Sequence, residues 1–373
     1  MIMNNPFFKE IKGRFGFGCM RLPMVGELVD LEQFQKMVDA FLASGLNYFD
    51  TAHVYIEGQS ETALRRCLTS RYPREAFILT NKLSGSCFET EEDIRPLFRS
   101  QLDACGVEYF DFYLLHAQHA GNYPKYKACR AYETAFALKK EGKIRHVGIS
   151  FHDKAEVLDR ILTDYPQIEA VQIQFNYLDY EDPMVQSRKV YETAARHGKP
   201  VIVMEPVKGG KLVQLPAEAR QCFDSLGGDS AAAYALRFAA GFENMMMVLS
   251  GMSTLEQMED NLSVMTPPVP LNRAETETVL RVREIIRRYN LIACTACRYC
   301  VDGCPKSIPI PDLFSCQNAV TGGTEEDHEA LYAAYTEGKG KASDCIRCGA
   351  CEESCPQHLP IRKLLQRISA TFD

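Results

Sequence analysis

The sequence predicts an α/β protein, a barrel of eight strand–helix units followed by a small helical domain rich in cysteine. Two observations lead to this prediction. From residue 15 to residue 262, short apolar runs alternate with amphipathic helical stretches, which is typical of a parallel sheet with helical crossovers. Beyond residue 293, eight cysteines fall into two matching runs. We expect two domains, 1–272 and 273–373, because the prolines within 267–270 interrupt the alternation.

The barrel prediction depends on the number and order of the elements. The apolar runs give strand candidates at 15–20, 48–50, 76–80, 109–115, 145–148, 170–174, 200–204 and 245–249. Helical periodicity lies between them, at 31–43, 61–67, 92–105, 132–141, 155–163, 183–197, 229–238 and 255–264. Eight repeats over about 250 residues match the size of a (β/α)8 barrel, the TIM-barrel architecture. A doubly wound sheet is the alternative, but no G-x-G-x-x-G motif follows the first strand to support it.

A helix predicted at 273–288 leads into the second domain, where the cysteine spacing is informative. Each run reads C-x2-C-x2-C-x3-C-P, the pattern of two-cluster bacterial ferredoxins, in which the fourth cysteine serves the other cluster. This pattern predicts two [4Fe–4S] clusters with crossed ligands. The first set is Cys294, Cys297, Cys300 and Cys355, and the second set is Cys345, Cys348, Cys351 and Cys304.

The number of clusters stays open at this point. Segment 307–344 separates the two runs more widely than in small ferredoxins, and a helix is predicted within it at 325–335. Structural zinc is the alternative reading of the cysteines, but zinc sites use two cysteine pairs and leave the third cysteine of each run without a role. The two runs therefore favour an α-helical ferredoxin-like domain.

The composition and charge of the chain are those of a globular protein and argue against nucleic-acid and membrane partners. Charged residues make up 24% and hydrophobic residues 46% of the chain, as in ordinary globular proteins. The net charge of −7, without a basic stripe, argues against a nucleic-acid partner. We expect no membrane association, because no apolar stretch reaches the ~18 residues of a membrane span. Residues 1–13 lack the apolar run of a signal peptide and the other seven cysteines are scattered, so we expect a reducing cytoplasm.

The ends of three successive predicted strands contain polar residues that suggest catalysis. They read FDTAHVY, with Asp50 and Tyr55, then TNKL, with Lys82, and YLLHAQ, with His116. This set closely resembles the aldo/keto reductase family, whose catalytic residues are Asp, Tyr, Lys and His in this order. The segments GQSE at 58–61 and GKIRHVGIS at 142–150 also fit. With its cysteine-rich tail, the chain resembles the ferredoxin-fused branch of that family.

The chemistry of carbonyl reduction explains why these residue types belong together. Hydride transfer to a carbonyl needs a proton donor for the developing alkoxide, and Tyr55 can supply the proton. A free phenol has a pKa of about 10, and we expect a cationic Lys82 to lower the pKa of Tyr55. Asp50 would keep Lys82 charged, and His116 would orient the substrate carbonyl. We expect a small carbonyl or alcohol as substrate.

The resemblance also implies a nicotinamide site. The residues it points to are Arg21, Ser150, Gln174, Met204, Gly209, Gly210, Lys211, Gly251, Gln257, Asp260 and Asn261. By resemblance, the serine and glutamine would hold the carboxamide, the glycine–glycine–lysine segment the pyrophosphate, and the last two residues the adenine. Met204 replaces the aromatic residue that is usual in the family. Gly251 and Gln257 stand where NADPH-preferring relatives often carry Lys and Arg, so NADH and NADPH both remain candidates.

The role of the clusters leaves three hypotheses. The first is a nicotinamide-dependent carbonyl reductase whose clusters are structural, shape a substrate entrance or bind a partner. The second is an oxidoreductase that exchanges electrons with an external ferredoxin or flavoprotein, since one-electron clusters and two-electron hydride transfer do not couple directly. The third is an electron-transfer module on a silent barrel. The complete set of four catalytic residue types favours an enzyme.

Overall fold

The computed structural model describes residues 5–289, 291–322 and 327–373, and the chain divides into two compact units. The first unit comprises Met1–Pro206 and Ala232–Asn272, and the second comprises Val207–Ala231 and Arg273–Asp373. The expected domain boundary after residue 272 stays a prediction. By its contacts, Val207–Ala231 belongs to the second unit, although the sequence pattern placed it with the barrel.

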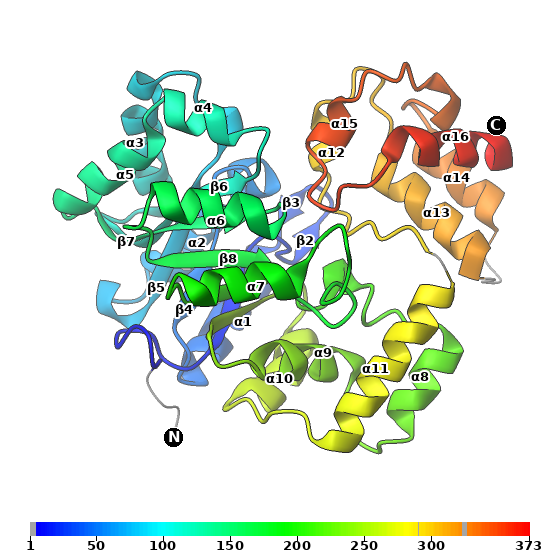
Figure 1. The fold of residues 1–373 in the computed structure, drawn as a ribbon, viewed down its shortest axis with the longest axis horizontal. Coiled ribbons are helices and arrows are strands. Elements are labelled where there is room, and N and C mark those ends of the chain that lie inside the picture. The colour runs from blue at the N-terminus through cyan, green and yellow to red at the C-terminus, as the bar shows by residue number, and fades with distance from the viewer. Residues whose placement is uncertain (1–4, 290, 323–326) are drawn as a thin grey trace. The chain divides into compact units, whose positions relative to one another are not determined.

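Eight parallel strands of the described chain close into a barrel in the first unit, which confirms the predicted fold class (Figure 1). The strands are β1 (Phe15–Gly18), β4 (Tyr48–Asp50), β5 (Ile78–Leu83), β6 (Phe110–Gln118), β7 (Ile144–Phe151), β8 (Ala170–Gln174), β9 (Val201–Met204) and β10 (Met245–Gly251). Each strand pairs with the next, and β1 pairs with both β4 and β10 to complete the ring. A short hairpin of β2 (Met24–Val25) and β3 (Leu28–Val29) follows the first barrel strand.

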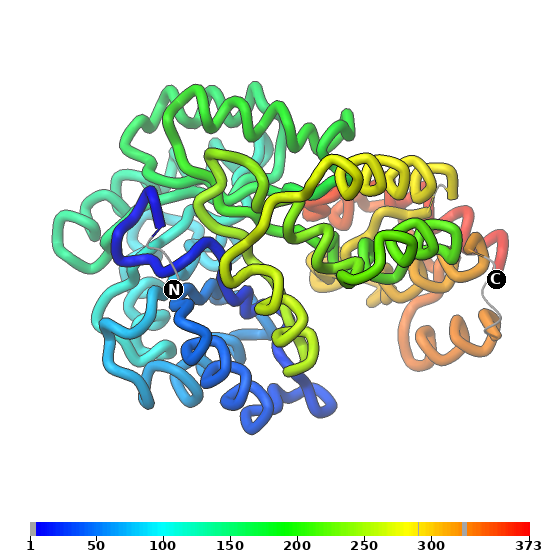
Figure 2. Tube along the Cα trace, turned by 90° about the horizontal axis from the view of Figure 1, so that it is seen from below, coloured from blue at the N-terminus to red at the C-terminus, as the bar shows by residue number. Residues whose placement is uncertain are grey.

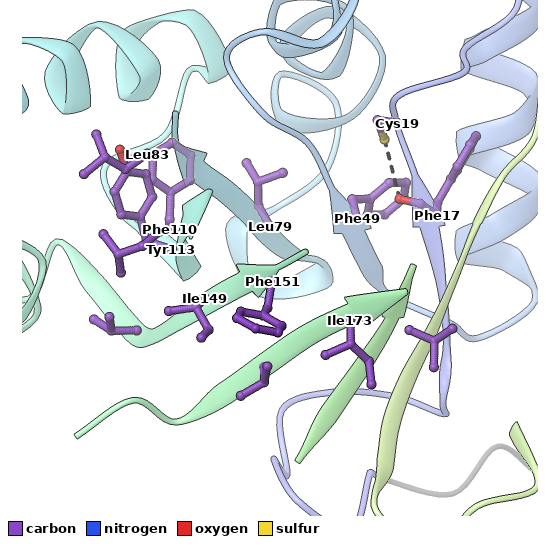
Figure 3. Packing of buried hydrophobic residues seen from close by; sticks show 14 of the residues in the cluster. Phe17, Cys19, Phe49, Leu79, Leu83, Phe110, Tyr113, Ile149, Phe151 and Ile173 are labelled. Atoms are coloured by element: carbon purple, nitrogen blue, oxygen red, sulfur yellow. Dashed lines mark hydrogen bonds between the residues drawn. The ribbon is translucent and has the colours of Figure 1, made fainter. Parts of the chain in front are cut away.

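Side chains alternate between the inside and the outside of the barrel, as the two-residue period of a strand requires. On β4, Tyr48 belongs to an inner apolar cluster, whereas Phe49 belongs to the cluster that includes helix residues. Phe49 packs edge-on against Phe41 of α1 (Leu31–Ala43), with ring centroids 5.2 Å apart. Figure 3 shows Phe49 with other outward-facing side chains of neighbouring strands. Asp50, one residue further, therefore faces inward, like Tyr48.

The helices around the barrel agree with the predicted pattern in order and mostly within a few residues. They are α1, α2 (Gln59–Leu64), α3 (Glu91–Cys105), α4 (Tyr123–Ala128), α5 (Ala131–Lys140), α6 (Ala155–Asp164), α7 (Ser187–Arg196), α9 (Ala231–Ala240) and α10 (Leu255–Met265). Local capping fixes several of these limits. Asp30 accepts a hydrogen bond from the backbone of Gln33 to start α1, and Gly106 in the left-handed region ends α3.

The second unit is helical and contains the cysteine runs. Its helices are α8 (Ala217–Asp224), α11 (Arg273–Arg288), α12 (Tyr299–Asp302), α13 (Ile310–Gly322), α14 (His328–Thr336), α15 (Ala350–Glu353) and α16 (Ile361–Phe372). Helix α8 packs alongside α11, as Figures 1 and 2 both show. The helix predicted at 325–335 corresponds to α14, although residues 325 and 326 lie outside the described residues. No described helix is long and apolar enough to cross a membrane.

Candidate active site and cysteine cavities

The four predicted catalytic residues lie at the carboxyl ends of neighbouring barrel strands, the end at which barrel enzymes build their active sites. Asp50 ends β4, Lys82 lies on β5, and His116 lies on β6. Tyr55 follows β4 in a short helical turn. All four side chains are buried within the first unit. The structure thus brings together the residues that the sequence singled out.

Lys82 is the centre of this group. Its amine donates hydrogen bonds to the Asp50 carboxylate at 2.5 Å, to the Thr51 carbonyl oxygen at 2.8 Å and to the Tyr55 hydroxyl at 3.1 Å. A lysine ammonium has three hydrogens to donate, and this arrangement uses all three. Because the Tyr55 oxygen accepts from Lys82, the hydrogen of the Tyr55 hydroxyl can point toward a ligand.

His116 lies beside Tyr55, with the two ring centroids 6.0 Å apart and the rings nearly perpendicular. The Nδ1 atom of His116 is 2.6 Å from the hydroxyl oxygen of Ser84, which follows β5. This contact fixes the orientation of the imidazole ring. When Ser84 donates to Nδ1, the Nε2 atom carries the proton and becomes a hydrogen-bond donor.

Burial dominates the electrostatics of the site. It raises the pKa of the Asp50 carboxyl and lowers the pKa of Lys82, while the attraction between these two groups opposes both shifts. Burial and the charge of Lys82 hold the pKa of His116 well below its usual value, so His116 is a neutral hydrogen-bonding group at neutral pH.

The expected lowering of the pKa of Tyr55 is wrong. Burial, followed by the Asp50 carboxylate, raises the pKa of Tyr55 well above the ordinary phenol value, while Arg21 opposes the shift. The sequence motif shows which charged residues lie near the phenol, but it does not show how far the fold removes water from it. This burial has the larger effect on the pKa of Tyr55.

Sequence reasoning missed two residues that support the catalytic group. Gln172 on β8 donates from its side-chain nitrogen to the second carboxylate oxygen of Asp50 at 3.1 Å, and Ser84 contacts His116. Each lies two residues from a residue that was predicted, Gln172 before Gln174 and Ser84 after Lys82. The two-residue period of a strand could have identified both as neighbours on the same face.

The nicotinamide candidates in the first unit lie at the ends of other barrel strands. The Ser150 hydroxyl at the end of β7 accepts a hydrogen bond from the Ala117 backbone at 2.7 Å. Gln174 at the end of β8 donates to the Asp179 carboxylate at 2.6 Å. Both side chains are buried. They lie near the ends of the paired strands β7 and β8, and their binding of a carboxamide stays a prediction. Met204, which ends β9, is half-buried.

A second group of candidates lies where β10 meets α10. Asn261 donates to the Ser250 hydroxyl at 3.0 Å, and the side-chain oxygen of Gln257 accepts from the Ser253 backbone at 2.8 Å. Asp260 is half-buried one residue before Asn261. The side chain of Arg21 lies against Gly251, where an added Cβ would be 3.4 Å away. This cation also forms a 3.8 Å ion pair with Glu205.

The remaining candidates, Gly209, Gly210 and Lys211, belong to the second unit. Gly209 has a φ of 61°, and a Cβ at this position would come within 2.4 Å of the Thr295 carbonyl oxygen. The glycine is therefore required by close backbone packing against the chain next to Cys294. Gly210 has a φ of 93°, also in the left-handed region, and an added Cβ would meet no atom within 4 Å.

The cysteines of the second unit surround two cavities. One is lined by Cys294, Cys297, Cys300 and Cys355, and we call it the first cavity. The other is lined by Cys304, Cys345, Cys348 and Cys351, and we call it the second cavity. The cysteines around each cavity are the crossed ligand set that the spacing predicts. Apolar side chains, among them Phe314 in the first cavity and Ile308 in the second, complete the walls.

This arrangement fits a [4Fe–4S] cluster in each cavity, since four thiols face a space with an apolar wall. In the described part of the chain, no three His, Cys, Asp or Glu side chains are grouped so that they could hold a metal ion. In a four-iron cluster the cysteines are distributed over the cluster, so the thiols need not converge on one point. Which cysteines bind iron, and how many clusters form, stay predictions.

Comparisons with known proteins agree with the family that the sequence resembles and with the predicted iron–sulfur domain. The family model described as the Aldo/keto reductase family matches residues 14–282, and the model described as a 4Fe-4S dicluster domain matches residues 293–359. Aldo-keto reductase str7 of Strobilurus tenacellus is 27% identical over 216 residues, which cover 55% of this chain and 61% of that protein. An aldo-keto reductase of Mycobacterium avium (strain 104) is 24% identical over 251 residues, which cover 65% and 81%.

Solved structures show the same fold. An aldo-keto reductase from Bacillus halodurans in its holo form aligns with a TM-score of 0.61 at 22% identity, over 76% of this chain and 96% of that one. An aldo-keto reductase from Klebsiella pneumoniae in complex with NADPH aligns with a TM-score of 0.61 at 18% identity, over 76% and 95%. At such identities the likeness establishes the barrel fold.

Proposed function

Because the chain belongs to the aldo/keto reductase family, we propose that it reduces an aldehyde or ketone, or oxidises the corresponding alcohol, with Tyr55 as the proton donor. The observation that carries this proposal is the buried contact between the Tyr55 hydroxyl and the Lys82 amine, 3.1 Å long, beside the Lys82–Asp50 ion pair. The proposed substrate is a small carbonyl compound or the corresponding alcohol.

Each catalytic residue has a separate role in this proposal. The reduced nicotinamide, when bound, supplies the hydride. Tyr55 donates its proton to the carbonyl oxygen as negative charge develops there. Lys82 stabilises the phenolate that remains, and Asp50 holds Lys82 in position. A neutral His116, oriented by Ser84, donates a hydrogen bond from Nε2 to the same carbonyl oxygen.

We infer that the chain binds NADH or NADPH. The buried polar side chains of Ser150 and Gln174 support this inference, as does the NADPH complex of the Klebsiella pneumoniae structure. At the adenosine end, neither Gly251 nor Gln257 has a positively charged side chain that could pair with a 2′-phosphate. We therefore expect no strong preference for NADPH. Titration with both nucleotides, followed by fluorescence, should detect binding of at least one.

The decisive test replaces Tyr55 by phenylalanine, which removes the hydroxyl and keeps the ring. We expect Tyr55→Phe to lower carbonyl reduction by about 10²–10⁴-fold, the usual contribution of a general acid. Iron content and cluster absorbance should stay unchanged. Tyr72→Phe is the matched control, because the Tyr72 hydroxyl donates to Asp39 away from the catalytic group. Undiminished reduction by Tyr55→Phe would show that Tyr55 is not the proton donor.

A second candidate function is electron exchange with a ferredoxin or flavoprotein. It is favoured by one observation, the exposure of Cys348 at the second cavity, because an exposed cluster ligand gives a redox partner a short path. If neither nucleotide binds in the titration, this function becomes the better proposal. It would then be tested by reducing the clusters anaerobically with a reduced ferredoxin.

A further inference from the structure

The loop that follows β9 contacts the wall of the first cavity at two adjacent residues. Strand β9 ends at Met204, and the loop that follows passes into the second unit at Val207. In barrels of this type, the loops after the strands form the ligand-binding face. From residue 207 onward, this loop lies in the same unit as the cysteine cavities.

The first contact is a buried hydrogen bond. The amine of Lys208 donates to the side-chain oxygen of Gln357 at 2.9 Å, and both residues are buried. Gln357 lines the first cavity and lies two residues after Cys355. Placing a lysine amine away from water is costly unless it has hydrogen-bond partners, so this position ties Lys208 to the cavity wall.

The second contact is between backbones. An added Cβ at Gly209 would lie 2.4 Å from the Thr295 carbonyl oxygen and 2.9 Å from the Thr295 Cα, and Thr295 also lines the first cavity. The loop thus contacts the second unit near the first and the last cysteine of this ligand set, Cys294 and Cys355. The lining of the second cavity, by contrast, comes from residues 304–310 and 345–365 and includes neither Thr295 nor Gln357.

We propose that Lys208 and Gly209 fasten the loop after β9 to the first cluster, so that this cluster orders the loop and experiences the charge of Lys208. The second cluster does neither. As far as the loop contributes to nicotinamide binding through Lys211, this inference rests on the proposed function. It gives the first cluster a role in ordering residues 207–212 that does not depend on electron transfer.

The charge of Lys208 can be tested through the reduction potentials. A nearby positive charge stabilises the reduced, more negative state of a cluster, so Lys208→Met should lower the potential of one cluster and leave the other unchanged. Lys306 lines the second cavity. Lys306→Met is therefore the matched control, and it should leave the potential of the first cluster unchanged. Potentials are measured by electron paramagnetic resonance during anaerobic redox titration of the full chain, with iron content checked for each variant.

The order of the loop can be tested by hydrogen exchange, without nucleotide or substrate. Cys297→Ala removes a ligand of the first cluster, and Cys348→Ala removes one of the second. We expect faster amide exchange at 207–212 in the first variant and in Lys208→Met, and no change in Cys348→Ala. If Lys208→Met changes neither a potential nor the exchange at 207–212, the inference is wrong. Because no nucleotide is present, a failed nucleotide titration would contradict the proposed function and leave this result intact.

Discussion

The buried ion pair between Lys82 and Asp50 should dominate the stability of the catalytic end of the barrel. The two side chains are 0% and 4% exposed, and Gln172 occupies the second oxygen of Asp50. Asp50→Asn keeps the shape of the side chain and removes its charge. Lys82 then remains buried without a counter-charge, and loss of one partner of such a pair costs about 3–5 kcal/mol. We expect a loss of this size in the free energy of unfolding.

The double variant Asp50→Asn/Lys82→Met separates the charge effect from the change in shape. Because no unpaired charge remains, most of the lost stability should return, giving a coupling energy of about 2 kcal/mol or more. Unfolding in urea under anaerobic conditions, followed by circular dichroism, measures Asp50→Asn, Lys82→Met and the double variant. The exposed pair Arg95–Glu141 serves as control, because removing it should cost less than about 1 kcal/mol.

Additive effects of the two substitutions would refute this reasoning. So would a loss below about 1 kcal/mol for Asp50→Asn, since the pair would then behave like a surface ion pair. Either result would mean that Lys82 is neutral in the folded protein, and its role in stabilising a phenolate would have to be abandoned.

Three further predictions concern other parts of the chain. Burial lowers the pKa of His146, but its hydrogen bonds to Glu169 and Glu10 outweigh burial, so the pKa is raised in the folded protein. The stability that this group contributes is therefore full below about pH 6.5 and is lost as the pH rises through the folded pKa. His146→Gln should make the urea midpoint of unfolding depend less on pH between about pH 5 and pH 8. Ser84→Ala should lower kcat/KM up to about tenfold and shift the tautomer of His116 in nitrogen NMR spectra, and an unchanged tautomer would contradict its orienting role. Anaerobically purified protein should contain about eight iron atoms per chain, and a count near four would leave one cluster.

The barrel and its catalytic group could be predicted from the sequence because both are marked by residue patterns within short stretches of the chain. Alternation of apolar runs and helices gave eight strands, and the observed strands begin within two residues of the predicted starts. Asp50, Lys82 and His116 were recognisable because each stands at or next to the end of a strand. Capping residues such as Asp30 mark the helix starts in the same local way.

Long-range packing explains what the sequence did not predict. Val207–Ala231 belongs to the second unit, where α8 packs against α11, Lys208 bonds to Gln357 and Gly209 lies against Thr295. The partners in the last two contacts are separated by 149 and 86 positions of the chain, and no local pattern encodes such a pairing. The raised pKa of Tyr55 has a similar origin, since it follows from burial by the whole fold.

The raised pKa of Tyr55 also bears on the direction of the reaction. Reduction needs the protonated phenol, and oxidation needs the phenolate to accept a proton from the alcohol. With a pKa well above the ordinary value, Tyr55 is protonated throughout the neutral range, which favours reduction. The pH profile of kcat/KM should therefore stay flat for reduction up to alkaline pH, while oxidation should increase about tenfold per pH unit over the same range. A profile for reduction that falls near neutral pH would mean that bound ligand lowers the pKa of Tyr55 and that Lys82, rather than burial, determines it.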